Sequence, residues 1–461
     1  MHSAIVLADA IGSQLYNWIF SPLFLQFLVT LLFAILFPIT SAAVINYLER
    51  KVMAWMQDRK GPLHVGPHGS LQLLADVGKM FTKEDVHAAK TDKAIFLLAP
   101  SAFIAPMIAS FAVLPFSPFL GLPGTALATG IIYLVAMSSL DVIGVLMAGW
   151  GSNNKYSLIG GLRAAAQMIS YELPLVLALV GVVMLTSALA GSPGYSGNAS
   201  IGTISLKEIM TFQNTWKDTG IGILDFIFKG FTPWAWFILV QPLMLLIYYI
   251  CGLAETNRSP FDLPEAESEL VAGFLTEYSG LRWAMFFLGE YGNMTIVSAI
   301  TTSLFLGGWS GPGVGFLTAP GMAFGWQLLG NILGVIYFVT KVYLLCVIFI
   351  WIRGTLPRLR ADQLMQFAWL MLIPATLGNI LLTGLLYLAV SGLGLSNLVF
   401  LIVTGAINWL LLIGFIRLVG RATVATTRRA QAPAIRARAR QAALARVAQL
   451  GKASGVEVKP Q

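Results

Sequence analysis

The sequence predicts an all-α protein, a polytopic bundle of about nine transmembrane helices. Hydrophobic residues make up 57% of the 461-residue chain, charged residues only 11%, and the mean hydropathy is +0.77, whereas soluble domains contain about 25% charged residues. Long apolar runs favour helices over an outer-membrane barrel, whose strands have about 10 residues of alternating polarity. Runs with the length of a membrane helix, about 20 residues, occur at residues 24–46, 95–117, 124–149, 170–191, 234–254, 284–308, 326–352, 367–391 and 396–419.

The basic residues predict how these helices are oriented. Of the 29 Lys and Arg residues, 25 fall in alternate loops and the C-terminal tail. Because basic residues concentrate in cytoplasmic loops, we expect these loops inside and the N-terminus outside. The first basic residue is Arg50, so the chain lacks the charged start of a signal peptide, and we expect the first span to remain. The net charge of +8 therefore reflects topology and a basic tail, and it does not indicate a nucleic-acid partner.

The cysteines limit which cofactors the chain binds. There are two, Cys251 and Cys346, and both lie inside predicted spans, so a four-thiolate iron–sulfur site is not possible. The chain also has no glycine-rich nucleotide-binding fingerprint. We therefore expect no iron–sulfur cluster or flavin in this chain, and any such group would belong to another subunit.

The first cytoplasmic loop predicts a short amphipathic helix. Asp76 and Lys79 alternate at helical spacing with apolar residues, a pattern typical of a helix lying at the membrane interface. A plain interfacial helix explains this pattern as well as a functional site does. His64 and His68 are separated by Gly66 and Pro67, which break the helix that a histidine pair would need, so we expect no metal site.

Ionisable residues inside the predicted spans are a stronger functional signal. Asp141, Glu290 and Lys341 fall within apolar runs, where a charge costs about 2.5–3.5 kcal/mol even on lenient scales. They therefore face the protein interior or water, either as internal ion pairs or as parts of a proton or ion path. Glu172 lies just before Pro174 at the start of a span, and its alternative role is a surface acid at a helix N-terminus.

One short segment, residues 255–278, holds six of the 21 acidic residues. Helix-start chemistry explains Asp262 and Glu265, which have the spacing of a capping box, but it does not explain Glu269 or Glu277. Placed on one helix, these four acids would share a face. If that face is shielded from water, desolvation and mutual repulsion raise their pKa values towards neutrality, as a proton relay requires.

The chain closely resembles the membrane H-subunit (subunit 1) family of respiratory complex I, the proton-translocating NADH:quinone oxidoreductase. The resemblance covers about residues 20–390, keeps the order of the family, and rests on long motifs. These are "ERKVMAWMQDRKGP", "VGPHGSLQLLADVGKMFTKE", "SNNKYSLIGGLRAAAQMISYELPL", "AETNRSPFDLPEAESELVAGFLTEYSG", "FFLGEY" and "WIRGTLPRLRADQLM".

The resemblance implies a multi-pass subunit of a bacterial inner membrane that forms much of a quinone chamber and couples quinone reduction to proton translocation. Its expected partners are the lipid bilayer, the small membrane subunits, and the iron–sulfur and quinone-site subunits of the peripheral arm. The positions that match quinone-chamber residues are Arg50, Arg59, Lys79, Phe287, Arg353 and Arg358. The positions that match an acidic proton path are Asp76, Glu172, Glu255, Asp262, Glu265, Glu267, Glu269, Glu277, Glu290 and, at the inner end, Lys341.

The chain departs from the family pattern in two places. Leu63 and His64 replace the usual Asn after "GP", which changes the local contacts of that turn. The family has eight spans, and a ninth follows here. We divide the chain into a domain that resembles the family (1–395), an extra transmembrane helix (396–420) and a basic, solvated tail (421–461).

Three other functions fit parts of the sequence. A membrane subunit of an energy-converting hydrogenase shares the acidic loop, but not the first and fourth cytoplasmic loops that this chain keeps. A stand-alone proton or cation transporter would explain the intramembrane charges, although no inverted repeat is evident. A passive anchor would use those charges as structural ion pairs.

Overall fold

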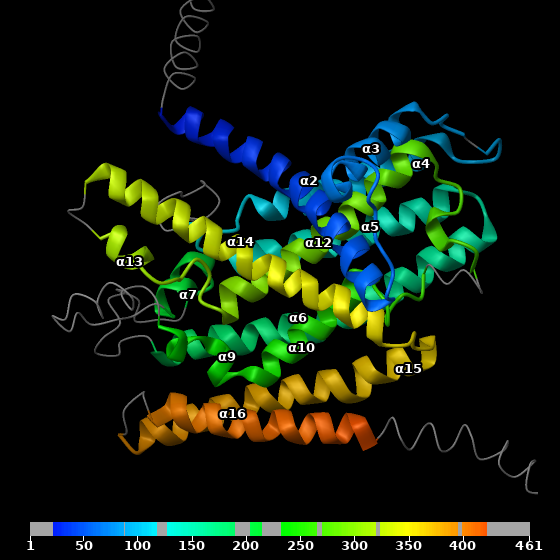
Figure 1. Cartoon of the computed structure of the whole chain (residues 1–461). Coiled ribbons are helices and arrows are strands. Elements are labelled where there is room, and N and C mark those ends of the chain that lie inside the picture. Colours follow the sequence, from blue (N-terminus) through cyan, green and yellow to red (C-terminus); the bar gives the residue numbers. More distant parts are fainter. Residues whose placement is uncertain are drawn as a thin grey trace, which may run out of the picture. The chain divides into compact units, whose positions relative to one another are not determined.

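The structure is a computed structural model that describes residues 22–86, 88–117, 127–189, 203–213, 232–264, 270–319, 323–394 and 399–421 (Figure 1). Within these ranges the chain forms helices and turns, without a strand. It divides into two compact units, Met1–Gly405 and Ala406–Gln461. The described part of the second unit, residues 406–421, is helical. Three acids of the predicted path, Glu265, Glu267 and Glu269, lie outside the described residues, as does the basic tail beyond residue 421.

The helices of the first unit are mostly long and apolar. They are α2 (Pro22–Met56), α3 (Gln72–Thr82), α4 (Lys93–Phe111), α5 (Gly130–Gly151), α6 (Lys155–Leu189), α7 (Leu206–Phe212), α9 (Phe237–Val240), α10 (Pro242–Glu255), α12 (Gly280–Phe305), α13 (Val314–Leu317), α14 (Phe324–Thr355), α15 (Ala361–Gln366) and α16 (Ile373–Gly392). The short 3₁₀ turns are η1 (Pro67–Gly69), η3 (Pro233–Ala235) and η4 (Gly273–Leu275), and η5 (Phe367–Leu372) is a π-helical stretch that joins α15 to α16.

The all-α prediction is confirmed, since each predicted span overlaps a described helix. Among the residues that the structure describes, six helices are long and apolar enough to cross a membrane. These are Lys93–Phe111, Gly130–Gly151, Lys155–Thr186, Gly325–Thr355, Ala361–Gly392 and Val399–Arg421. The count of nine spans and the N-out orientation stay predictions.

Two local predictions have different outcomes. The amphipathic helix of the first loop is confirmed as α3, which buries none of its residues and leaves Leu74 and Phe81 68% and 67% exposed. The start of α6 is earlier than predicted, because the helix runs from Lys155 through Pro174. Glu172 therefore lies inside a helix, and its alternative role as an acid at a helix N-terminus is wrong.

The acidic segment does not form the single helix that would align its acids. After residue 270 the chain makes turns and the 3₁₀ turn η4, with positive φ at Val271 (66°) and Gly273 (56°). The prediction that Glu277 shares a helical face with Asp262 is therefore wrong. The chain turns here because η4 packs directly on α6. The two backbones are so close that a Cβ atom on Gly160 would lie 2.6 Å from the Gly273 Cα.

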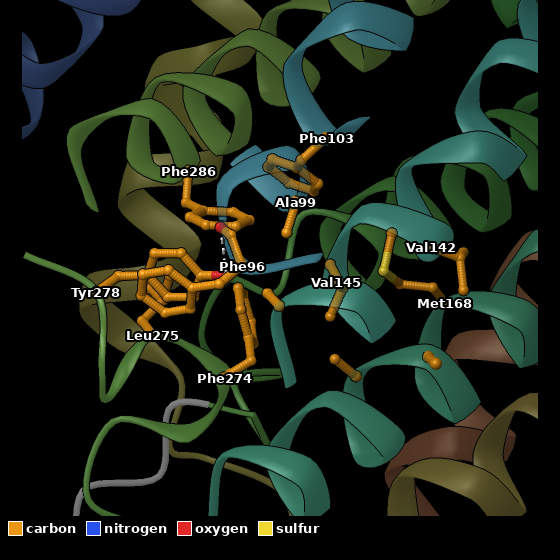
Figure 2. Close-up of a cluster of buried hydrophobic side chains, with 13 residues drawn as sticks. Phe96, Ala99, Phe103, Val142, Val145, Met168, Phe274, Leu275, Tyr278 and Phe286 are labelled. Atoms are coloured by element: carbon orange, nitrogen blue, oxygen red, sulfur yellow. Dashed lines mark hydrogen bonds between the residues drawn. The ribbon is translucent and has the colours of Figure 1, made fainter. Parts of the chain in front are cut away.

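An apolar core holds this turn in place (Figure 2). It contains residues from α4, α5, α6, η4 and α12. The Tyr278 ring stacks on Phe96 with 4.2 Å between centroids, and its hydroxyl donates to the Phe96 carbonyl oxygen at 3.3 Å. Phe286 of α12 meets Tyr278 edge to face at 4.9 Å. The core thus ties the end of the acidic segment to the helices on either side of it.

Candidate functional site

Arg258 lies at the centre of a buried group of charges, although the sequence did not predict it as a site residue. It is 6% exposed. Its Nη1 is 3.8 Å from Glu49 Oε1, and its Nη2 is 3.6 Å from Glu290 Oε2. The guanidinium also lies 4.3 Å from the ring centroid of Tyr291, within the range of a cation–π contact. One cation is therefore shared by two carboxylates and an aromatic face.

Four segments far apart in the sequence build this group, which we call the arginine cluster. Arg258 comes from the loop after α10. The other members are Glu49 of α2, Phe287, Glu290 and Tyr291 of α12, and Arg353 of α14. The α12 residues meet on one side of the helix because positions three and four apart are neighbours. The packing of α12 against α2, α4, α10 and α14 (Figure 1) brings the four segments together.

Glu49 is the most fully bonded member of the cluster. Its Oε2 accepts a hydrogen bond from the Tyr291 hydroxyl at 2.6 Å, and its Oε1 accepts one from Arg353 Nη1. Because Arg258 lies beside the same Oε1, Glu49 has two guanidinium neighbours. Charge-assisted hydrogen bonds of this kind are the strong ones in proteins.

Gln167 of α6 positions the loop that carries Arg258. Its buried Nε2 donates to the carbonyl oxygens of Ala254 at 2.8 Å and Phe261 at 2.6 Å, on either side of Arg258. The side-chain oxygen of Asn257 lies at 3.3 Å from the same nitrogen. This loop is therefore fastened to α6 at both of its ends.

A second ion pair joins α2 to α3. Arg50 Nη1 lies 2.6 Å from Asp76 Oδ2, and Gln72 Nε2 donates to Asp76 Oδ1 at 3.1 Å. Partial burial raises the pKa of Asp76, but the hydrogen bonds from Arg50 and Gln72 and the charges of Arg50 and Lys79 outweigh it, so the pKa lies below its ordinary value. Lys79 itself is exposed on α3.

The predicted quinone residues Arg50 and Arg59 both border an open hollow of about 600 Å³ beside α3, together with His64 and Gln72. Arg59 also borders a second hollow of about 440 Å³. Hollows of this size are large enough for a small organic head group, since ligand pockets measure about 300–1,000 Å³.

The remaining predicted quinone residues lie elsewhere. Phe287 and Arg353 belong to the arginine cluster, as described above. Arg358 Nη2 lies 2.5 Å from Asp262 Oδ2, which pairs the loop after α14 with the acidic segment. The structure thus divides five of the six residues among the α2–α3 hollow, the arginine cluster and the Arg358–Asp262 pair, and it leaves Lys79 exposed on α3.

The predicted path acids Glu172 and Glu255 are neighbours beside α5. Ser139 Oγ donates to Glu172 Oε1, and the side chain of Ser138 hydrogen-bonds to Glu255. The charge of Glu172 acts on Glu255. Two consecutive serines of one helix therefore hold two acids that come from α6 and α10.

Glu277 and Lys341 lie apart from the other predicted groups. Asn154 Nδ2 donates to Glu277 Oε1 at 2.8 Å. The Lys341 ammonium of α14 donates to the carbonyl oxygens of Leu306 (2.8 Å), Gly308 (3.0 Å) and Ser310 (2.8 Å). It also lies 4.4 Å from the Trp236 ring centroid. Backbone oxygens, rather than carboxylates, are thus the bonded partners of this cation.

Two residues of the arginine cluster have a signal in the sequence that the predictions above did not use. Arg258 is the only Lys or Arg within the acidic segment 255–278, and Glu49 opens the first family motif. A single cation among six acids predicts a shared partner. Tyr291 likewise ends the quoted motif "FFLGEY", whereas Ser138 and Ser139 have no comparable signal, because hydroxyl groups are common in helices.

The chain is similar to known proteins over most of its length. Residues 28–384 match the NADH dehydrogenase family. The chain is 40% identical over 380 residues to the NADH-quinone oxidoreductase H subunit numbered 1 of Geobacter sulfurreducens, an alignment that covers 78% of this chain and 95% of the relative. It is 42% identical to the H subunit of Dehalococcoides mccartyi strain CBDB1 (79% and 88% covered) and 45% identical to the H subunit of Brevibacillus brevis (73% and 86% covered). The chain therefore belongs to the NADH dehydrogenase family and, within it, to the H subunits of NADH-quinone oxidoreductase, which are membrane subunits of respiratory complex I.

Proposed function

We propose that this chain forms part of the quinone-binding chamber of an NADH-quinone oxidoreductase and couples quinone reduction to proton translocation through buried carboxylates. The arginine cluster is the observation that carries the proposal. It places two carboxylates, Glu49 and Glu290, around one buried arginine. Intramembrane ionisable groups of this kind mark ion and proton paths.

The quinone head group is proposed to bind near the α2–α3 hollow. Arg50 and Arg59 border this hollow, and both can donate hydrogen bonds to a quinone oxygen. Arg50 and Glu49 are consecutive residues of α2. A change of charge on the quinone therefore acts, through one helix, on both the Arg50–Asp76 pair and the arginine cluster.

The mechanism follows from the charge that reduction creates. Reduction of a quinone to a quinol adds two electrons and takes up two protons. Nearby carboxylates either give up protons or feel a transient negative charge. Either event changes how strongly Glu49 and Glu290 attract Arg258. The loop that carries Arg258 then changes between two states, and this change couples quinone reduction to the proton path.

The next acids of the proposed path are Glu172 and Glu255, which lie together beside α5. Glu255 ends α10, and Arg258 follows it within the same loop. Asp76, Asp262 and Glu277 each have a polar or charged partner that holds them in place. We include Glu265, Glu267 and Glu269 in the path on the family resemblance alone.

Lys341 is proposed to close the inner end of the path as a fixed cation, since its bonded partners are backbone oxygens. We also propose the bacterial inner membrane as the location and the peripheral-arm and small membrane subunits as partners. These proposals rest on the relatives, which are named as subunits of a quinone oxidoreductase.

The test is neutralisation of the path acids in the assembled complex. Glu290→Gln and Glu255→Gln, alone and together, are expected to lower NADH:quinone reductase activity and proton pumping while the complex still assembles. Proton transfer by a positioned group contributes about 10²–10⁴-fold to a rate. The matched control is Glu208→Gln, an exposed acid of α7. Full activity and pumping in an assembled double variant would contradict the proposal.

A passive anchor is the second candidate, and the ion pairs themselves favour it. Arg258 lies within 4 Å of both Glu49 and Glu290 and compensates their charges, as a structural ion pair would. The same double variant separates the two functions. An anchor predicts weaker assembly with normal pumping for each NADH oxidised in the complexes that do assemble.

A further inference from the structure

Asp141 is a buried acid that the proposed path does not include. It lies in the middle of α5 and is 2% exposed. Its Oδ2 accepts a hydrogen bond from Asn293 Nδ2 of α12 at 2.6 Å. Its Oδ1 has no hydrogen-bond partner within the part of the chain that the structure describes. Burying a polar atom without a hydrogen-bond partner costs free energy. This oxygen therefore indicates that a ligand binds beside it.

Asp141 borders a cavity. Its volume is about 30 Å³, whereas one water molecule needs about 10–15 Å³. Most of its wall is apolar, but its polar lining residues are Ser110, Ser138, Asp141, Tyr248, Glu255 and Asn293. A water molecule needs two to four polar partners to stay in such a cavity, and these residues supply them.

The cavity also connects Asp141 with the acid at the end of α10. Glu255 borders the same cavity, and its charge acts on Asp141. Ser138, which hydrogen-bonds to Glu255, lies one helical turn before Asp141 on the same face of α5. Two carboxyl groups from different helices therefore border one small cavity.

We infer that this cavity holds water and that Asp141 is a further proton-binding group, which exchanges protons with Glu255 through that water. In the forward step the O–H bond at Asp141 Oδ1 breaks, the proton passes to the water, and the water gives one of its own protons to a Glu255 oxygen. The reverse step restores Asp141. The inference rests on the proposed function, and it adds a group on α5 to the proposed path.

A purely structural role for Asp141 is the competing explanation. The Asp141–Asn293 hydrogen bond ties α5 to α12, and a helix tie needs no mobile proton. Asp141→Asn separates the two roles, because an amide has nearly the same shape and can still bond to Asn293, but it carries no exchangeable acid proton. Asp141→Glu restores the acid.

The experiment uses the complete oxidoreductase in its membrane and measures three quantities. These are protons pumped per NADH oxidised, the infrared difference spectrum in the carboxylic-acid C=O region on reduction, and cryo-EM density for water in the cavity. We expect Asp141→Asn to lower the number of protons pumped per NADH oxidised, to remove an infrared acid band, and to leave assembly intact. We expect Asp141→Glu to restore a shifted band and part of the pumping.

The results distinguish this inference from the proposed function. Normal pumping and an unchanged spectrum in Asp141→Asn, with impaired pumping in Glu255→Gln, overturn the inference and leave the proposed function standing. Normal pumping in both variants overturns both. A cavity without water density in the assembled wild-type complex also overturns the inference. If Asp141→Asn does not assemble, the presence or absence of a shifted acid band in Asp141→Glu decides.

Discussion

Two cations, one buried and one partly buried, lie beside α12 and beside the turn that follows it, and their charges are compensated in different ways. Arg258 lies beside Glu290 and Tyr291 in the first half of α12, and its charge is met by carboxylates and an aromatic face. Lys341 lies beside the turn that follows α12, and its charge is met by three backbone carbonyl oxygens of that turn and by the Trp236 ring. Both cations are therefore compensated, but by groups of different chemistry.

The difference concerns which partner can change. A carboxylate can take up a proton and lose its charge, whereas a peptide carbonyl cannot, so the arginine cluster is able to respond to chemistry at the quinone. The Lys341 site is fixed: a cation there satisfies carbonyls that a helix end leaves without partners. The buried turn after α12 adopts positive φ at Gly307 and Gly308 to present them.

The largest effect is expected at the arginine cluster, whose carboxylates can change their charge. Arg258→Met leaves Glu49 and Glu290 without their shared cation, and removing one partner of a buried ion pair costs about 3–5 kcal/mol. We expect severe loss of assembled complex, measured on native gels, with part of it regained in Arg258→Met/Glu290→Gln. Arg282→Met is the control, because the partner of Arg282, Asp85, is 45% exposed. Equal effects of the two arginine substitutions would mean that the cluster is not special.

The next largest effect is expected at the Lys341 site. Lys341→Met leaves three buried carbonyl oxygens without their donor, and each unsatisfied group costs about 1–3 kcal/mol. We expect a lower melting temperature of the complex, with the number of protons pumped per NADH unchanged in the fraction that assembles. A fall in that ratio in a stable complex would show that Lys341 takes part in proton transfer, and the contrast between the two sites would be lost.

A smaller change sharpens the role of Glu49. Tyr291→Phe removes one hydrogen bond to this carboxylate, and hydrogen bonds to charged groups contribute about 1.5–3 kcal/mol. We expect a moderate loss of thermal stability and slower quinone reduction, measured side by side in membranes. Tyr387→Phe is the control, since this tyrosine is 39% exposed. An unchanged rate would remove Tyr291 from the coupling mechanism.

The smallest effect is at the partly exposed pair outside the arginine cluster. Because the pKa of Asp76 is lowered in the folded protein, its stabilising contribution is present above the ordinary Asp pKa and is lost as the pH falls through the lowered value, below about pH 4. A double-mutant cycle of Arg50→Ala and Asp76→Ala should give no more than about 1 kcal/mol near neutral pH. A larger coupling energy, or one that changes between about pH 6 and 8, would contradict this account.

The sequence predicted the helices better than their contacts. Apolar runs mark the membrane part of each helix, but the apolar criterion missed the first turns of α6, where polar Ser157 is buried against the Phe274 carbonyl oxygen. The turn after residue 270 has a positive φ at Val271, a residue type that gives no signal for it. Glu49 and Arg353 are 304 residues apart, and one sequence alone does not predict such a pair.

The single amide group of Gln167 has a mechanical consequence. It holds the Ala254 and Phe261 carbonyl oxygens at the same time, so the chain between them is closed into a ring that is clamped to α6. Glu255 and Arg258 both belong to that ring. A displacement of the Arg258 backbone is therefore passed to the rest of this ring. We expect the ring to turn as one body, so that Glu255 moves whenever Arg258 does.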